Sequence, residues 1–437
     1  MEKGRRFFYL LRMAAEAHAR WEIESANDIL RNRKKLLILL ALSLPALGFV
    51  GYSFAAGTDF LGGKEAYAPS FYSNFIFFVS IFIGLCAGLI TGCIGAGGGF
   101  VITPALMSAG VKGILAVGTD LFHIFAKAIM GTAVHRKLGN VSVKLAVVFL
   151  VGSTVGVVVG GTINRAIYDY NPVMSDLFIS LVYVFLLGFL GIYAMTDFFR
   201  LRAAGRQTKI VAPSGPAPAP TAAATTGLAQ KLQSVQIPPM ISFDEDVVPG
   251  GNKIAGIFVV ICGFIVGLTA SIMGVGGGFL TFPMFVYLLG VSSFTTVGTD
   301  ILQIIFTAGF AAISQYAIYG FIFYTLAMGM LLGSLLGIQV GALTTKVVKG
   351  IYIRGFYAIT ILAGFINRIF ALPKKLNQME YISISKALAG WIDFIGMIIF
   401  FLIVAIFGIW VFSMFFKNIN VLRGKEVPSA SVGGGGH

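Results

Sequence analysis

Charged residues are scarce in this chain of 437 residues, since Asp, Glu, Lys and Arg together make up only 11% of it. A soluble domain carries about 25%. Hydrophobic residues make up 57%, and the mean hydropathy is +0.88. The composition therefore predicts an all-α protein that crosses a membrane several times. The net charge of +14 arises mostly from Lys and Arg between apolar runs, which is typical of cytoplasmic loops and not of a nucleic-acid surface.

Cysteine is also rare. The three cysteines, Cys86, Cys93 and Cys262, lie in apolar runs and have neither disulfide-framework nor metal-ligand spacing. The chain also lacks a nucleotide-binding P-loop and a Ser-His-Asp arrangement, so we expect no enzyme, no ATP-driven pump, no metal and no cofactor. Residues 1–35 lack the compact apolar core and cleavage site of a signal peptide.

Glycine, by contrast, is abundant, and it interrupts apolar segments twice in the same way. Gly95–Pro104 reads GAGGGFVITP, and Gly274–Pro283 reads GVGGGFLTFP. Each is followed by Gly-Thr-Asp, at Gly118–Asp120 and Gly298–Asp300. Glycine costs a helix about 1 kcal/mol relative to alanine, so such runs need a reason. Helix breaks at corresponding places in two halves indicate the binding site of a transporter.

Apolar runs of membrane length predict the helices. A spanning helix needs about 20 apolar residues. The predicted spans are 36–57, 71–94, 98–111 (short), 114–136, 143–165, 174–199, 252–273, 277–290 (short), 294–318, 322–344, 351–370 and 391–416. Glycines at every fourth position, Gly152, Gly156 and Gly160 with Gly333, Gly337 and Gly341, predict close helix packing.

The predicted organisation has two transport repeats with flanking helices. It comprises a cytoplasmic or interfacial amphipathic helix at 1–35, a flanking span at 36–57, repeat 1 at 71–200, a cytoplasmic flexible linker at 201–250, repeat 2 at 251–370, a C-terminal span at 391–416 and a flexible tail at 417–437. Basic clusters put the N-terminus in the cytoplasm. If the short segments cross the membrane, each repeat has five membrane segments and the two are inverted. Arg368, Lys374 and Lys375 then fall on the external side, against this rule.

At the glycine motifs, the Gly-Thr-Asp sequences and His135–Asn140, the chain resembles the sulfite exporter TauE/SafE family, also called the 4-toluene sulfonate uptake permeases. The resemblance covers about 71–200 and 252–370 and leaves the ends and the linker outside. It implies a transporter of sulfite, organosulfonates or related small sulfur anions. Export is favoured by the resemblance alone.

The broken helices suggest how an anion is bound. Each short helix starts inside the membrane, and its free N–H groups carry about half a positive charge. The predicted substrate-binding residues at the breaks are Gly97, Gly98, Gly99 and Phe100 with Gly276, Gly277, Gly278 and Phe279. The alternative is close helix packing without a ligand.

Polar side chains follow each break along one helix face. Asp120, His123 and Lys127 correspond to Asp300, Gln303 and Thr307 in the second copy. Lys127 and Gln303 are predicted to bind substrate, and Asp120, Asp300 or His123 to couple protons. The competing interpretation makes the two aspartates helix N-caps and Lys127 part of a structural pair. Thr119 and Thr299 are either caps or substrate hydroxyls.

The sequence thus predicts a secondary transporter with alternating access in a bacterial-type inner membrane. Its expected partners are a small anion and membrane lipids, and the oligomeric state stays open. An anion channel is the first alternative, because the same dipole ends suit an open pore. A membrane scaffold or sensor subunit is the second.

Overall fold

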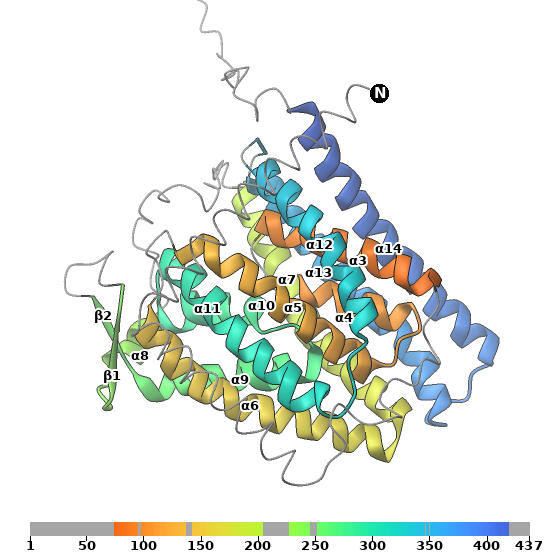
Figure 1. Ribbon diagram of the computed structural model, residues 1–437, viewed down its shortest axis with the longest axis horizontal. Helices are drawn as coiled ribbons and strands as arrows, with labels where there is room; N and C mark the ends of the chain where they lie inside the picture. The colour runs from red at the N-terminus through yellow and green to blue at the C-terminus, as the bar shows by residue number, and fades with distance from the viewer. Residues whose placement is uncertain are drawn as a thin grey trace, which may run out of the picture.

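The computed structural model describes residues 74–94, 98–136, 142–203, 227–244, 251–345, 347–348 and 350–418. The predicted amphipathic helix at 1–35, the span at 36–57, Gly97 and all but the first two residues of the tail at 417–437 lie outside the described residues. The rest is almost entirely helical (Figure 1).

The first part of the chain forms α3 (Asn74–Ile94), α4 (Gly99–Ser108), α5 (Gly113–Arg136), α6 (Val143–Tyr170) and α7 (Pro172–Ala203). The second part forms α9 (Gly256–Met273), α10 (Gly278–Pro283), the π-helix η2 (Met284–Leu289), α11 (Ser293–Ala311), the π-helix η3 (Ala312–Ala317), α12 (Tyr324–Thr345), α13 (Gly350–Gln378) and α14 (Lys386–Lys417). Within the described residues, seven helices are long and apolar enough to cross a membrane: α3, α6, α7, α9, α12, α13 and α14. The prediction of an all-α polytopic membrane protein is confirmed.

Both glycine runs break a helix where the sequence predicts. Gly98 precedes α4 with φ 68°, and Gly277 precedes α10 with φ 87°. This left-handed backbone is readily adopted only by glycine. At each glycine run the chain therefore ends one helix and starts another within a few residues.

The two parts of the chain exchange helices. α3 packs along α12, and α6 packs along α9 (Figure 1). A Cβ on Gly152 of α6 would lie 1.9 Å from the Val260 carbonyl oxygen, and one on Gly333 of α12 would lie 2.0 Å from that of Ile81. The prediction that the glycine rows serve close packing is confirmed.

Two further pairs join counterparts of the two parts, α5 with α11 and α7 with α13. Equivalent elements thus make equivalent contacts, as two related repeats would. The opposite membrane orientation of the repeats remains a prediction from the positive charges.

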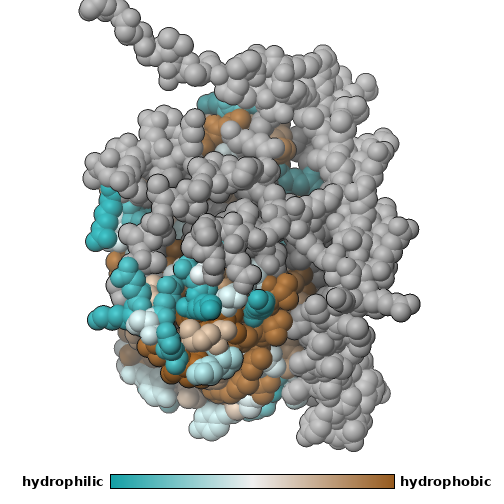
Figure 2. All heavy atoms as spheres, turned by 90° about the vertical axis from the view of Figure 1, so that its left-hand side faces the viewer, coloured by the Kyte–Doolittle hydropathy of each residue, from teal (hydrophilic) through white to brown (hydrophobic). Residues whose placement is uncertain are grey.

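The described residues 227–244 and 251–255 differ from the predicted flexible linker at 201–250. They contain α8 (Gly227–Ser234) and the antiparallel strands β1 (Met240–Phe243) and β2 (Asn252–Ala255), with Met240 opposite Ala255 and Phe243 opposite Asn252. The polar and Pro-rich composition of the linker predicts no such structure. Ala229, Phe243 and Ile254 are nevertheless buried and pack α8, β1 and β2 onto the helices. Figure 2 views the molecule from this end, where hydrophilic side chains border a hydrophobic surface.

Three cations that conflict with the charge rule have local partners. Lys374 pairs with Asp393 at 2.8 Å, and Lys375 pairs with Asp176 at 2.7 Å. Arg368 is 3% exposed and donates to the Pro104 carbonyl of α4 at 3.1 Å. A count of loop charges does not take such contacts into account.

Candidate functional site

The two helix breaks meet in the interior. The ring centroids of Phe100 and Phe279, which follow the two glycine runs, are 6.4 Å apart. A Cβ on Gly99 would lie 2.8 Å from the Val275 Cα. Phe100 is fully buried and Phe279 is 3% exposed. The breaks therefore share one buried centre.

The glycines of this centre face protein atoms. The Cβ positions of Gly99 and Gly276 are 2.8 and 2.7 Å from the Ile124 side chain. Those of Gly277 and Gly278 are 2.4 Å from Val266 and 2.7 Å from Ile304. In this conformation the glycines allow close packing, which agrees with the alternative interpretation. An anion at these positions requires the three contacting side chains, Ile124, Val266 and Ile304, to move.

A polar cluster on α5 lies beside the first break. Thr103 of α4 donates to Asp120 Oδ2 at 3.0 Å, and His123 Nε2 lies 3.0 Å from Ser334 Oγ of α12. Asp120 and His123 are fully buried. The predicted stripe therefore points into the protein and joins helices from both halves of the chain.

Lys127 extends this cluster to the start of α4. It is 7% exposed and donates to Thr91 Oγ1 of α3 at 3.1 Å. A Cβ on Gly98, the residue that precedes α4, would lie 2.9 Å from the same Thr91 oxygen. A cation and a helix N-terminus thus approach the same hydroxyl, which is the electrostatic environment that favours an anion.

The corresponding cluster on α11 is a closed hydrogen-bond network. Gln303 Nε2 donates to Asp300 Oδ1 at 2.8 Å and to Thr281 Oγ1 at 3.1 Å. Thr307 donates to Gln303 Oε1 at 2.9 Å and lies 3.1 Å from Ser153 Oγ of α6. The α11 cluster thus reaches Ser153 of α6 as the α5 cluster reaches Ser334 of α12, although Thr307 and His123 are not counterparts.

Asp300 also distinguishes the second break from the first. Its Oδ2 lies 3.3 Å from the Cβ position of Gly278, the first residue of α10. A carboxylate is stabilised at a helix N-terminus. The positive end of α10 thus already has an anionic side chain beside it, whereas the corresponding position at α4 has a cation nearby.

The two threonines of the Gly-Thr-Asp sequences make matching structural contacts. The Phe323 N–H donates to Thr119 Oγ1, and the Ser142 N–H donates to Thr299 Oγ1, both at 3.0 Å. Each contact lies at the start of a helix of the other repeat, α12 or α6. The geometry favours the capping interpretation for both hydroxyls.

The interpretation of the two aspartates as N-caps of the helices that follow them is wrong. α5 begins at Gly113, well before Asp120, and the N-cap of α11 is Ser292, whose hydroxyl accepts from the Thr295 N–H. Gly118 lies within α5, and its missing Cβ allows the Phe321 carbonyl oxygen to approach that helix.

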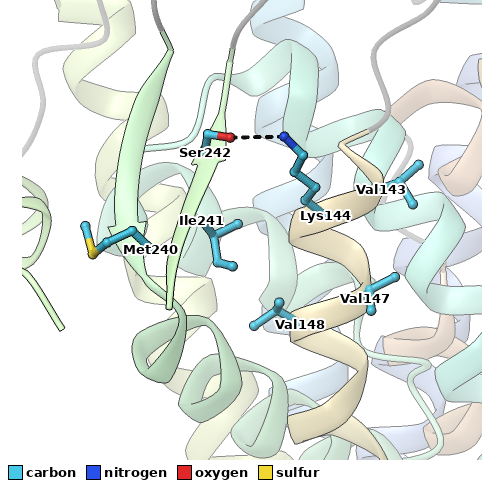
Figure 3. Close-up of a pocket in the computed structure, with 7 residues that line it drawn as sticks. All are labelled: Val143, Lys144, Val147, Val148, Met240, Ile241 and Ser242. Carbon is cyan, nitrogen blue, oxygen red and sulfur yellow. Dashed lines mark hydrogen bonds between the residues drawn. The ribbon is translucent and has the colours of Figure 1, made fainter. Parts of the chain in front are cut away.

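Sequence reasoning missed the residues that complete the two clusters: Thr91, Thr103, Ser153, Thr281 and Ser334. Thr103 and Thr281 belong to the repeated motifs, and Ser153 and Ser334 each follow a matched glycine. For these four residues the repeat was therefore the available signal. An open groove between α6 and β1, lined by Val143, Lys144, Val147, Val148, Met240, Ile241 and Ser242 (Figure 3), contains none of the predicted site residues.

Comparisons with known proteins agree with this architecture. Residues 80–368 match the family model described as "Sulfite exporter TauE/SafE". Among relatives, the chain is 27% identical over 271 residues to "Probable membrane transporter protein YjnA" of Bacillus subtilis (strain 168), covering 60% of this chain and 87% of the relative. It is 25% identical over 277 residues to "Probable membrane transporter protein YunE" of the same organism, covering 61% and 87%.

A third relative, "Probable membrane transporter protein" of Xylella fastidiosa (strain 9a5c), is 24% identical over 269 residues, covering 61% of this chain and 83% of the relative. No solved structure matches the chain. The family match spans both glycine breaks and both polar clusters. The chain therefore belongs to the sulfite exporter TauE/SafE family of membrane transporters.

Proposed function

We propose that this protein is a secondary transporter, working as an exporter, of a small sulfur-containing anion such as sulfite or an organosulfonate. The family description names sulfite export. The observation that carries the proposal is the convergence of Lys127 and the start of α4 on Thr91. A buried cation beside a helix N-terminus favours an oxyanion because charge and N–H donors act together.

The anion binds at the first break in this proposal, and the second break has a supporting role. Asp300 lies beside the start of α10 and repels a second anion there. Lys127 and Asp120 interact electrostatically, so their opposite charges leave the cluster as a whole close to neutral before the anion arrives. The site is therefore asymmetric although the fold repeats.

The transport mechanism is alternating access around the two broken helices. Phe100, Asp120 and His123 are fully buried, which supports a carrier with an occluded state over a continuously open channel. Opening requires Ile124 and Val275 to separate from the break glycines that they contact. We place the protein in a bacterial-type inner membrane with its N-terminus in the cytoplasm.

Reconstitution in liposomes tests the proposal. Saturable flux of sulfite or methanesulfonate is expected, and Lys127→Gln should weaken binding by about 1.5–3 kcal/mol, the worth of a hydrogen bond to a charged group. Thr307→Val, the matched change in the second copy, should have a smaller effect. Equal losses in both variants would mean that Lys127 is structural. Conductance beyond carrier rates would indicate a channel, and absence of any anion flux would favour a scaffold.

A further inference from the structure

Two buried polar atoms in the first cluster face each other without a hydrogen bond. Asp120 Oδ1 and His123 Nδ1 are 3.8 Å apart on α5. Both are buried and have no hydrogen-bond partner among the described residues. The other polar atoms of these side chains are engaged, Asp120 Oδ2 with Thr103 and His123 Nε2 with Ser334. Leaving buried polar groups unsatisfied costs about 1–3 kcal/mol each.

The hydrogen bonds fix which nitrogen of His123 carries the hydrogen. Ser334 Oγ donates to the Leu331 carbonyl at 3.2 Å, so the same oxygen accepts from His123 Nε2. In the neutral imidazole, Nδ1 then has a lone pair and no hydrogen. An ionised Asp120 oxygen is also only an acceptor. Two acceptors therefore face each other, and one added proton satisfies both.

The second copy makes the same contact without a proton. Gln303 Nε2 donates its own hydrogen to Asp300 Oδ1 at 2.8 Å. Gln303 is the counterpart of His123, and a carboxamide does not titrate between pH 5 and 8. The contact between Asp300 and Gln303 is therefore permanent, whereas the one between Asp120 and His123 depends on proton binding.

We propose that Asp120 and His123 form the proton-binding site that couples anion movement to proton movement, an inference that rests on the proposed function. The pair takes one proton from water, and its charge changes from −1 to 0. Together with Lys127 the cluster changes from neutral to +1, which favours the anion at the neighbouring break. The proton returns to water when the anion leaves on the other side.

Among the described residues, few charged groups act on the pair of Asp120 and His123. Thr91 of α3, Thr103 of α4 and Ser334 of α12 contact the cluster as neutral hydroxyls. Tyr183 of α7 interacts with Asp120, and Arg368 of α13 interacts with Tyr183. Tyr183 donates to the Met273 carbonyl at 2.6 Å and stays neutral. Lys127 on the same helix is thus the charge that acts most directly on the pair.

The test measures methanesulfonate affinity of the purified full-length protein between about pH 5 and 8, where this strong-acid anion keeps one charge. In the wild type, affinity should rise as pH falls, by up to about tenfold per pH unit, the limit for one linked proton. His123→Gln, which copies the second repeat, should bind with no pH dependence. Asp120→Asn, whose amide can donate to His123 Nδ1, should also bind methanesulfonate with no pH dependence. Asp300→Asn, the matched control, should keep the wild-type slope.

The outcomes separate this inference from the proposed function. If the methanesulfonate affinity of His123→Gln still depends on pH, or if that of Asp300→Asn does not, the inference is overturned and the transporter proposal stands. Absence of anion binding in every protein overturns the transporter proposal. The pH dependence of the melting temperature without ligand then still decides the inference, because wild type and His123→Gln must differ if the pair binds a proton.

Discussion

The break at Gly98 offers a prediction whose magnitude can be worked from the structure. Gly98→Ala puts a side chain on a left-handed residue with φ 68°, which costs about 1–2 kcal/mol. The new Cβ would lie 2.8 Å from the Ala87 carbonyl oxygen and 2.9 Å from Thr91 Oγ1, and such overpacking costs about 1–3 kcal/mol. The free energy of unfolding should fall by about 2–5 kcal/mol in total.

Two other glycines separate these contributions. Gly110 has φ 94° and open space where its Cβ would be, so Gly110→Ala should cost only the backbone strain of about 1–2 kcal/mol. Gly390 lies in α14, also with open space around its Cβ position, so Gly390→Ala should be neutral or stabilising by up to about 1 kcal/mol. The measurement is unfolding in mixed micelles with increasing sodium dodecyl sulfate.

The test is the order in which the three variants lose free energy of unfolding, with Gly98→Ala losing the most and Gly390→Ala the least. If Gly98→Ala costs no more than Gly110→Ala, the close contact of Gly98 with α3 does not matter and the packing of the first break is misjudged. Because Thr91 binds Lys127, Gly98→Ala should also weaken anion binding, whereas Gly110→Ala should not.

Further predictions concern the contacts that hold the repeats in place. Asp244→Asn should cost about 1–3 kcal/mol, because the Asp244 carboxylate accepts from both the N–H and the hydroxyl of Ser292 at 2.8 and 2.6 Å. Hydrogen exchange should then quicken at the start of α11, and unchanged exchange would contradict a capping role for residues 227–244. Thr119→Val and Thr299→Val should each cost about 1 kcal/mol with anion affinity retained; a selective loss of affinity in either variant would restore that hydroxyl to the binding site.

Much of the fold can be predicted from the sequence because membrane-spanning helices require long apolar runs. Long apolar runs predict α3, α6, α7, α9 and α12 to α14, since each must cover the hydrocarbon layer. The ends agree within five residues except at α13, which continues to Gln378 beyond the predicted end at 370. Glycine runs predict both breaks, because no other residue readily adopts the backbone found at Gly98 and Gly277. The family follows from the same motifs.

The parts that could not be predicted depend on contacts between distant residues. The sequence places Asp120, His123 and Lys127 on one face, but it does not say that Ser334 fixes the histidine tautomer. It identifies Asp300 as a buried acid, but not its position beside Gly278. The regular structure of residues 227–244 was not predicted because Pro and Ala dominate the composition of the neighbouring segment. A few buried apolar side chains determine the packing instead.

The exchange of partners between the repeats has a consequence for how the protein is made. The glycine faces of α6 and α12 each need a helix from the opposite half of the chain. When the ribosome has finished α7, the helices α9 and α12 have not yet been made. The glycine face of α6 then has only lipid beside it, and α3 lacks its partner. Biogenesis therefore cannot proceed one half at a time, and a protein cut between the halves should become stable only when both pieces are produced in the same membrane.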